Sequence, residues 1–461
     1  MKRVRFHSVA GEQEGSGFLM VLVLITVMSI LIAAVLALYV AQHRFIRRDA
    51  HRLQARYAAE AGVYIAMDSL QQNPSWRAVE AVVDLPEGQT SHVTVEAFGG
   101  YVLIRSAAQY RRSRCTARAL IGEVPPPSFE NALQQWDGES GLHLAGTTAI
   151  TGNIVVGRRG VKTKTFKRQR FTGRIRGAVF NVPDLQPPYF DSRFLQTAIE
   201  EAERYLRGAS DPLLSDPKAL PLARRLPSEN RVYVASGDLR LTPADSLLLQ
   251  EPMTVMAQGD LIVEGPIPLQ PGTMLLAGKT LQIGKRVTGR DGLFFGREGL
   301  AITDTTRLSG QFFSRAYIRA AAAAYLAYPS VLYVTGERVV PDGSIVVEDG
   351  AVIDGTLIYP PMDPRPEVRR GRVRIQPAAQ VRGAIFNAHE TEFHGTLYGA
   401  LLTRHFYFYE SPTSYVNWLK DAVVNVEERP ANYLLPLGFS PAPRLAVLRW
   451  DVFLEEAPRL P

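Results

Sequence analysis

The most concentrated chemical feature of this sequence is a basic segment between residues 158 and 176, which contains no acidic residue. Its nine cationic side chains are Arg158, Arg159, Lys162, Lys164, Lys167, Arg168, Arg170, Arg174 and Arg176. Such a segment attracts polyanions, and the intervening Phe166 and Phe171 could stack on nucleic-acid bases. DNA, an acidic polysaccharide and lipid headgroups are therefore open as partners, beside the simpler interpretation of a solvated loop.

Residues that could support catalysis or bind a metal are sparse. There is no Walker loop, no HExxH, no GxSxG and no His/Cys cluster at metal spacing, and the one cysteine, Cys115, offers no disulfide framework. The strongest enzymatic alternative is an anchored polysaccharide lyase or hydrolase using Asp291, Arg297, Glu298 and Asp304. A metal site could be formed by His389, Glu390, Glu392 and His394, although a polar loop explains the same residues. We predict a non-enzymatic protein without metal or cofactor.

An aromatic cluster near the C-terminus is a third candidate surface. It runs from His405 to Tyr409 and continues with Tyr415, Asn417 and Trp418. Exposed rings of this kind could bind sugars or a partner. Alternating aromatic residues on strands more often fill a core or close its end, and we favour that interpretation.

These side chains belong to a body of short, imperfectly repeated strands. From about Gly141 onward, an apolar residue, a spacer, Gly, a spacer and two or three apolar residues recur, often 20 to 30 residues apart. Instances begin at Ile150, Ile175, Leu308, Ile353, Val381 and Phe393. Solenoid turns accept insertions between strands, so we predict a right-handed parallel β-helix, with antiparallel β-sandwich domains as the alternative.

Three segments depart from the repeat. Apolar residues at helical spacing predict a short helix over Ser192–Leu206, and the Ala-rich stretch Ala320–Ala327 predicts a second one that stops before Pro329. After Pro430 the repeat fades, and Arg444–Leu454 alternates like a final strand, which we expect to cover the open end of the solenoid.

The N-terminal region predicts a membrane anchor that continues as a stalk. Residues 18–40 contain no charge, and a bilayer core needs about 20 such residues. A signal peptide would have a shorter apolar region and a cleavage site for export, so we expect the span to be retained. An apolar stripe then follows one face of an amphipathic helix that ends near Asn73-Pro74. The stripe comprises Ala50, Leu53, Tyr57, Ala61, Tyr64 and Ile65.

Two motifs in this region resemble the N-terminal segment of type IV pilin-like proteins, over about residues 12–72. Gly17 followed by Phe18 looks like a prepilin-peptidase junction, in which Gly precedes the first mature residue. The run Tyr57, Ala58, Ala59, Glu60, Ala61 and Gly62 is similar to the signature that follows the span in PilX-type minor pilins and type II secretion K-type pseudopilins. Ordinary pilins carry Glu at the fifth mature position, where this chain has Leu22. K-type pseudopilins also lack this glutamate.

The resemblance implies a non-enzymatic filament subunit at a tip or initiating position, whose partners are other pilin or pseudopilin subunits, prepilin peptidase and the inner membrane. It also implies a cytoplasmic N-terminus and a periplasmic or extracellular body. Five arginines after the span against three basic residues before it favour the opposite orientation. A bactofilin-like, membrane-anchored scaffold that self-assembles is therefore an alternative.

The expected domains follow from these patterns. They are a leader (1–17), the span (18–40), the stalk (41–73), a small β-rich linker domain (74–136), the β-helix (137–430, with a helical insertion near 190–207) and a C-terminal cap (431–461).

Overall fold

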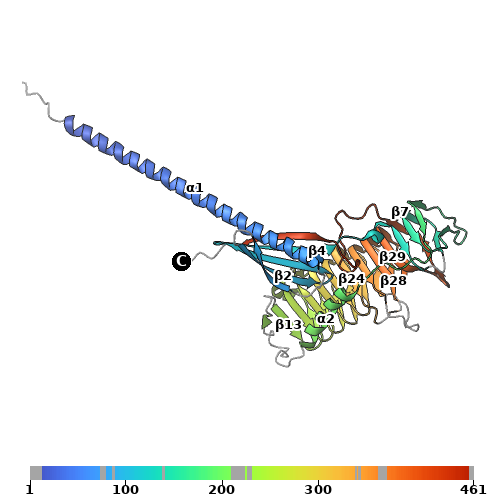
Figure 1. Ribbon diagram of the computed structural model, residues 1–461. Helices are drawn as coiled ribbons and strands as arrows, with labels where there is room; N and C mark the ends of the chain where they lie inside the picture. Colours follow the sequence, from blue (N-terminus) through green and yellow to red (C-terminus); the bar gives the residue numbers. More distant parts are fainter. Residues whose placement is uncertain are drawn as a thin grey trace, which may run out of the picture.

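The computed structural model describes residues 13–72, 79–85, 89–137, 141–208, 224–225, 231–337, 340, 344–361 and 371–455. A long helix leads into an antiparallel sheet, and that sheet lies against a parallel solenoid (Figure 1). The mostly β body follows the apolar helix, as the sequence predicts. The antiparallel-sandwich alternative is wrong for the solenoid, whose strands pair in parallel.

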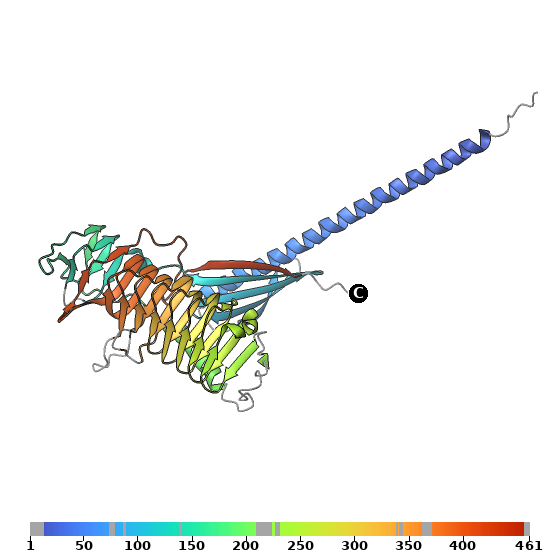
Figure 2. The same ribbon diagram turned by 180° about the vertical axis from the view of Figure 1, so that it is seen from behind.

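Helix α1 (Gln13–Gln72) is continuous over 60 residues, or about 90 Å. Its N-terminal half projects away from the rest of the molecule (Figure 1, Figure 2). The part from Gly17 onward is long and apolar enough to cross a membrane, and its most apolar window has no buried residue. The described part of the helix ends at Gln72, and Asn73-Pro74, where the sequence predicts its end, lie outside the described residues. Residues 1–12 of the expected leader lie outside the described residues.

A five-stranded antiparallel sheet receives the C-terminal half of α1. Its order is β1 (Val79–Leu85), β2 (Gln89–Phe98), β3 (Tyr101–Tyr110), β4 (Ser113–Glu123) and β33 (Leu445–Glu455). The strand expected to cover the open end of the solenoid is β33, and that expectation is wrong. It pairs with β4 over most of its length, because its alternating residues extend the sheet on which α1 packs.

The face of α1 that packs on this sheet is not the predicted stripe. The buried residues are Ala55, Ala58, Ala59, Val63, Ala66 and Leu70. Leu53, Tyr57 and Tyr64 of the predicted stripe are 49, 63 and 56% exposed. The four alanines let the helix approach the strands closely, and Val63 and Leu70 are buried with them. Leu53 and Tyr57 remain exposed, and Tyr64 stacks on Trp450 of β33 at 5.5 Å.

The solenoid has three faces of parallel strands stacked in register. In spatial order, the first face contains β13 (Arg231–Ala235), β15 (Met253–Ala257), β18 (Met274–Ala277), β20 (Thr288–Gly296), β22 (Arg307–Ser314), β24 (Tyr325–Val334), β26 (Val352–Tyr359), β28 (Gln380–Phe393), β29 (Thr396–Glu410), β5 (Leu133–Gln135), β8 (Ile154–Val156) and β11 (Val179–Asn181). The second contains β14 (Leu239–Leu241), β16 (Leu261–Val263), β19 (Thr280–Ile283), β21 (Gly299–Ile302), β23 (Ile318–Ala320), β25 (Ile345–Val347), β27 (Arg372–Ile375), the ends of β28 and β29, and then β31 (Trp418–Lys420), β6 (Leu142–Ala145) and β9 (Val161–Thr163). The third contains β17 (Pro268–Leu269), the starts of β20, β22, β24, β26, β28 and β29, and then β32 (Val423–Asn425), β7 (Ala149–Thr151) and β10 (Arg174–Arg176).

The repeated glycines of the sequence form a corner of this solenoid. Gly355, Gly383 and Gly399 are in register where the strands turn from the third face to the first. Gly383 and Gly399 have φ angles of 143° and 152°, and a Cβ on either would overlap the carbonyl oxygen of the glycine one turn before it. The repeat therefore encodes a bend that residues with a Cβ resist. Gly395, from the predicted instance at Phe393, lies outside this register.

The order of the turns in space differs from their order in the chain. Strand β29, near residue 400, pairs with β5, near residue 134. Residues 133–181 therefore form the turns that stack on the turn ending near residue 425. The chain then returns along the solenoid through α2 (Arg193–Gly208) to begin again at β13 (Figure 1). The described ends of the solenoid are thus β13, paired with the short β12 (Arg224–Arg225), and the β10 and β11 turn.

Helix α2 matches the predicted helix, and five of its buried residues pack on outward-facing residues of the first face. The helix predicted over Ala320–Ala327 is wrong, since the segment contains the end of β23, a turn and the start of β24. Ala320, Ala324 and Leu326 lie in the solenoid core, where small residues fit the corner and packing overrides helix propensity. Short 3₁₀ helices, Pro127–Glu130 and Pro243–Gln250, and the strand β30 (Thr413–Val416) complete the described elements.

Candidate functional site

The signature on α1 is a close contact between helix and sheet. Ala58 and Ala59 are 3 and 0% exposed, and a Cβ on Gly62 would overlap the hydroxyls of Ser91 and Ser106. These two hydroxyls hydrogen-bond each other at 2.6 Å across β2 and β3. The small residues of the signature therefore bring the helix against a polar pair in the middle of the sheet.

The remaining members of the signature face outward. Glu60 accepts a hydrogen bond of 2.8 Å from Arg56 Nε, one helical turn earlier, and Tyr57 is exposed. The Gly17-Phe18 junction lies within α1, where Phe18 is 72% exposed and no atom lies within 4 Å of a Cβ built on Gly17. The signature is thus 40 residues from the junction on one continuous helix.

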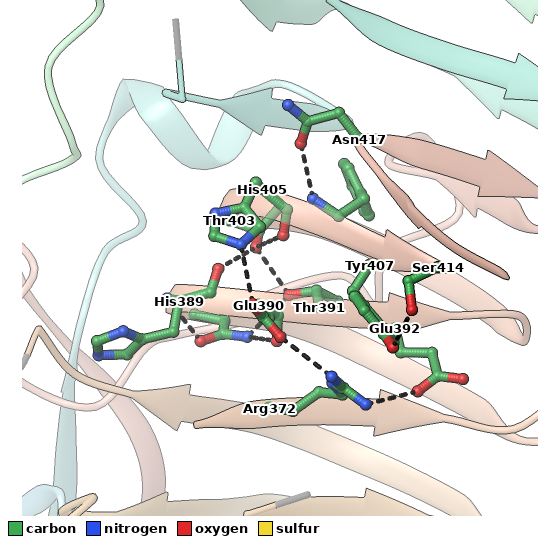
Figure 3. A network of polar contacts seen from close by, with 12 residues as sticks. Arg372, His389, Glu390, Thr391, Glu392, Thr403, His405, Tyr407, Ser414 and Asn417 are labelled. Atoms are coloured by element: carbon green, nitrogen blue, oxygen red, sulfur yellow. Dashed lines mark hydrogen bonds and ion pairs between the residues drawn. The ribbon is translucent and has the colours of Figure 1, made fainter. Parts of the chain in front are cut away.

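A ladder of charged side chains crosses β27, β28 and β29 on the second face (Figure 3). Arg372 lies between Glu390 and Glu392, at 3.1 and 3.5 Å, and its guanidinium group is 3.7 Å from the centre of the Tyr407 ring. His405 Nε2 lies 3.4 Å from Glu390. Although burial opposes ionisation, the basic neighbours hold the pKa of each glutamate below its ordinary value. The ladder joins three adjacent strands.

The structure does not bring the four candidate metal ligands of the alternative interpretation into one site. His389 packs against the Tyr359 ring, and its Nε2 lies 3.2 Å from the carbonyl oxygen of Pro360. Burial lowers the pKa of His389 to about 4, so its ring is neutral at pH 7. His394 contacts Glu392 at 3.6 Å instead. Across the described residues, no three potential ligands gather around one point.

The candidate residues of the enzymatic alternative are also dispersed. Asp291 is 8% exposed and forms an ion pair with Arg449 of β33, which joins the solenoid to the antiparallel sheet. Arg297 contacts Glu203 of α2 at 3.3 Å. Asp291 and Arg297 are close in the sequence but take part in two separate ion pairs, one with β33 and one with α2.

The basic segment forms the last turn of the solenoid, beyond β7 in Figure 1. All nine of its cationic side chains are exposed, and we call this set the basic end. Lys162 lies on β9, Arg174 and Arg176 lie on β10, and the others occupy the connecting loops. The sequence therefore identified a surface at one extremity of the molecule.

The aromatic cluster adjoins the basic end. Phe166 packs edge-on against Phe408, Tyr415 and Trp418 at 5.3 to 5.8 Å, and Lys167 pairs with Glu410 at the tip of the β29–β30 hairpin. Phe166 is only 4% exposed and Phe171 packs on the solenoid core, so the expectation that these rings stack on bases is wrong. The accessible rings nearby belong to Tyr409 and Phe180, each 48% exposed.

Sequence reasoning missed the buried carboxyl group of Glu123, at the junction of sheet and solenoid. One of its oxygens accepts backbone hydrogen bonds from Gly438 and Phe439, each of 3.0 Å. Burial raises its pKa to about 7. The charge ladder was missed too, although a signal exists: Arg372 and Arg374 alternate on one strand, and Glu390 and Glu392 repeat that spacing one turn later.

Comparisons with known proteins give a distant similarity to solved structures. No protein-family model matches the chain, and no curated protein matches it. Among solved structures, the chain is similar to the competence-associated pilin ComZ from Thermus thermophilus, with 13% identity and a TM-score of 0.19, over 88% of this chain and 98% of that one. A TM-score this low carries no argument about fold or function.

Proposed function

We propose that this chain is a non-enzymatic subunit of a type IV pilus or type II secretion filament, similar to PilX-type minor pilins and K-type pseudopilins. The observation that carries the proposal is the continuity of α1. One helix contains the apolar span and the Gly17-Phe18 junction, and its signature packs on an antiparallel sheet through Ala58, Ala59 and Gly62. Such a helix can be withdrawn from a membrane into a helical bundle without rearranging the body.

In this proposal, prepilin peptidase removes residues 1–17 on the cytoplasmic side of the inner membrane, and the new N-terminus at Phe18 enters the filament. The body is periplasmic or extracellular, despite the arginines that follow the span. Leu22 provides no carboxylate to pair with the amine of a neighbouring subunit. The chain would therefore occupy the tip or an initiating position, where the solenoid is displayed for adhesion or assembly.

Incorporation into filaments tests this proposal. The full chain is produced in a bacterium that assembles type IV filaments, and sheared filaments are probed with an antibody against the chain. We expect the wild type and a Gly15→Ala control in the sheared fraction, with Gly17→Arg retained in the membrane. Wild-type protein that stays in the membrane while filaments assemble around it would contradict the proposal.

We further propose that the basic end binds a polyanion, with DNA or an acidic polysaccharide as the candidates. Its nine exposed cations lie at the extremity opposite β13, beside the exposed rings of Tyr409 and Phe180. A row of cations releases counterions from a polyanion, and accessible rings add stacking to bases or sugars. Because each released counterion weakens binding in salt, the affinity should fall steeply with ionic strength.

Binding is measured with the full chain in detergent micelles against single-stranded DNA and an acidic polysaccharide. Replacing all nine cations by Gln should reduce the affinity by at least 100-fold at 50 mM salt and flatten its salt dependence. A matched control replaces Lys279, Lys285, Arg286 and Arg290, which are exposed on the solenoid around β19 and at the start of β20 and are not part of the basic end. Unchanged affinity in the nine-residue variant would remove the basic end as the binding surface.

A further inference from the structure

A second group of arginines surrounds α1 just beyond the apolar span. On the helix, Arg44, Arg47 and Arg48 are exposed within eight residues of Val40. In the β3–β4 hairpin, Arg111, Arg112 and Arg114 are exposed as well. We call these six residues the arginine collar. They come from two segments that lie more than 60 residues apart in the chain.

Packing of the sheet on α1 orients this hairpin toward the membrane span. Ser106, in the middle of β3, lies at Gly62, whereas Tyr110, at the end of the strand, contacts the ring of His51 at 5.5 Å. The strand thus runs toward the N-terminal half of the helix, and Arg111 and Arg112 form its tip. His51 is 11 residues beyond Val40, which is about 16 Å along the helix axis.

The distance from the hairpin to the apolar surface of α1 is shorter than the rise of about 16 Å between Val40 and His51. Phe45 and Ile46 are 64 and 62% exposed and extend the apolar surface of α1 beyond Val40. From Ile46 to His51 the helix rises only about 8 Å, and transmembrane helices commonly tilt by about 20°. The long side chain of arginine can bridge the remainder, so the hairpin lies within reach of lipid headgroups.

The hairpin also borders a polar cavity suited to a phosphate group. The cavity has a volume of about 480 Å³ and is lined by Thr90, His92, Ala107, Ala108, Gln109, Arg111, Arg114, Cys115 and Thr116. Gln109 fixes the turn: its amide donates to the carbonyl oxygen of Arg111 at 2.8 Å and accepts from Arg114 Nε at 3.0 Å. The guanidinium groups and hydroxyls of the lining are hydrogen-bond donors, which is the chemistry that phosphate oxygens require.

Among the described residues, no carboxylate forms an ion pair with Arg111, Arg112 or Arg114 of the hairpin. Asp49 lies 3.9 Å from Arg52, which is not a collar residue, and Asp84 is near the end of β1. The three hairpin arginines therefore keep their charge available for an anionic surface.

We propose that the β3–β4 hairpin binds the phosphate headgroups of anionic phospholipids while α1 spans the membrane, so that the body is held against the bilayer. This inference needs the membrane span but not filament assembly, and it concerns a different surface from the basic end. Each arginine near an anionic surface adds about 1 kcal/mol, or roughly fivefold in the ratio of docked to undocked molecules.

Fluorescence quenching in proteoliposomes tests the proposal with the full chain. Ser113→Cys, in a Cys115→Ala background, carries a fluorophore at the hairpin tip, and nitroxide-labelled headgroups quench it. Vesicles with 30% phosphatidylglycerol should quench strongly at low salt, and phosphatidylcholine vesicles should not. Replacing Arg111, Arg112 and Arg114 by Gln should lower the docked-to-undocked ratio on the order of 100-fold, whereas replacing Lys279, Lys285 and Arg286, which are exposed on the solenoid, should change nothing.

Three outcomes would overturn the proposal. The first is equal quenching in anionic and neutral vesicles, and the second is full quenching of the triple arginine variant once circular dichroism shows that it is folded. The third is loss of quenching on adding 5 mM inorganic phosphate at constant ionic strength, because the hairpin would then prefer free phosphate to lipid. Failure of filament incorporation alone would leave this result untouched.

Discussion

At the scale of single residues, Gly62 explains why the signature on α1 contains small side chains. A methyl group there would overlap the hydroxyls of Ser91 and Ser106. We predict that Gly62→Ala lowers the free energy of unfolding by about 1–3 kcal/mol, because overpacking outweighs the gain in helix propensity of about 1 kcal/mol. Thermal unfolding followed by circular dichroism in detergent measures the change.

The control for this prediction is Gly208→Ala at the end of α2, where no atom lies within 4 Å of the added methyl group. That variant should unfold within about 0.5 kcal/mol of the wild type. Adding Ser91→Ala and Ser106→Ala to Gly62→Ala should recover part of the loss. A Gly62→Ala variant as stable as the control would mean that the helix does not pack this closely.

Glu123 predicts a pH dependence of stability. Its pKa is about 7 in the folded chain and near 4.5 when exposed, so the folded state holds the proton more tightly. The stabilisation from this group is complete below pH 4.5 and is lost as the pH rises through about 7, by up to about 3 kcal/mol. Glu123→Gln keeps an acceptor for Gly438 and Phe439 but cannot ionise.

Melting temperatures of wild type and Glu123→Gln between pH 5 and 8.5 test this prediction. The wild type should lose more stability than the variant as the pH rises, and the variant should be the more stable protein at pH 8.5. Parallel curves for the two proteins would show that Glu123 is not the titrating group.

The junction at Gly17-Phe18 and the signature at Tyr57–Gly62 are short patterns that the sequence displays directly, and their pilin-like meaning stays a prediction. The burial of Phe166 was not predictable, because its partners Phe408 and Trp418 come from strands more than 240 residues away. The division of Asp291 and Arg297 between separate contacts depends on β33 and α2 in the same way.

At the scale of elements, the glycine corner is the feature that most strongly determines the solenoid. We predict that Gly383→Ala destabilises the body by about 3 kcal/mol or more, because the methyl group would overlap the Gly355 carbonyl at a φ angle of 143°. Gly237→Ala, in a turn with no atom within 4 Å of the added methyl group, should be nearly neutral. Chemical denaturation of both variants compares them, and similar midpoints would contradict the corner assignment.

Secondary-structure elements were predicted well where a residue type occurs mainly in one kind of structure. Glycine within a recurring apolar pattern indicated turns of a solenoid, and apolar residues at helical spacing placed α2. Alanine and large apolar residues on a helix have several uses, and there the predictions were wrong. The segment Ala320–Ala327 lies in two strands and a corner of the solenoid instead of a helix. Leu53 and Tyr57 of the predicted stripe remain exposed on α1.

At the scale of the whole molecule, the antiparallel sheet flanks the solenoid in the chain, and the turns of the solenoid follow one another in a different order in space than in the chain. The turns formed by residues 133–181 stack on the turn that ends near residue 425, and β33 returns to the sheet that β4 leaves. The sequence could not reveal this order, since each turn carries nearly the same apolar pattern and nothing local specifies its neighbour. The arrangement places the basic end at one extremity, far along the solenoid from β13 (Figure 2).

The measurement that tests the central claim most directly is N-terminal sequencing of the mature protein. The full chain is purified from the membrane of a bacterium with active prepilin peptidase, and a peptidase-deficient strain provides the control. The proposed filament function predicts a terminus at Phe18 in the first strain and an uncleaved chain in the second. A chain that still begins at Met1 in the presence of an active peptidase would contradict the claim that α1 is a filament-forming helix.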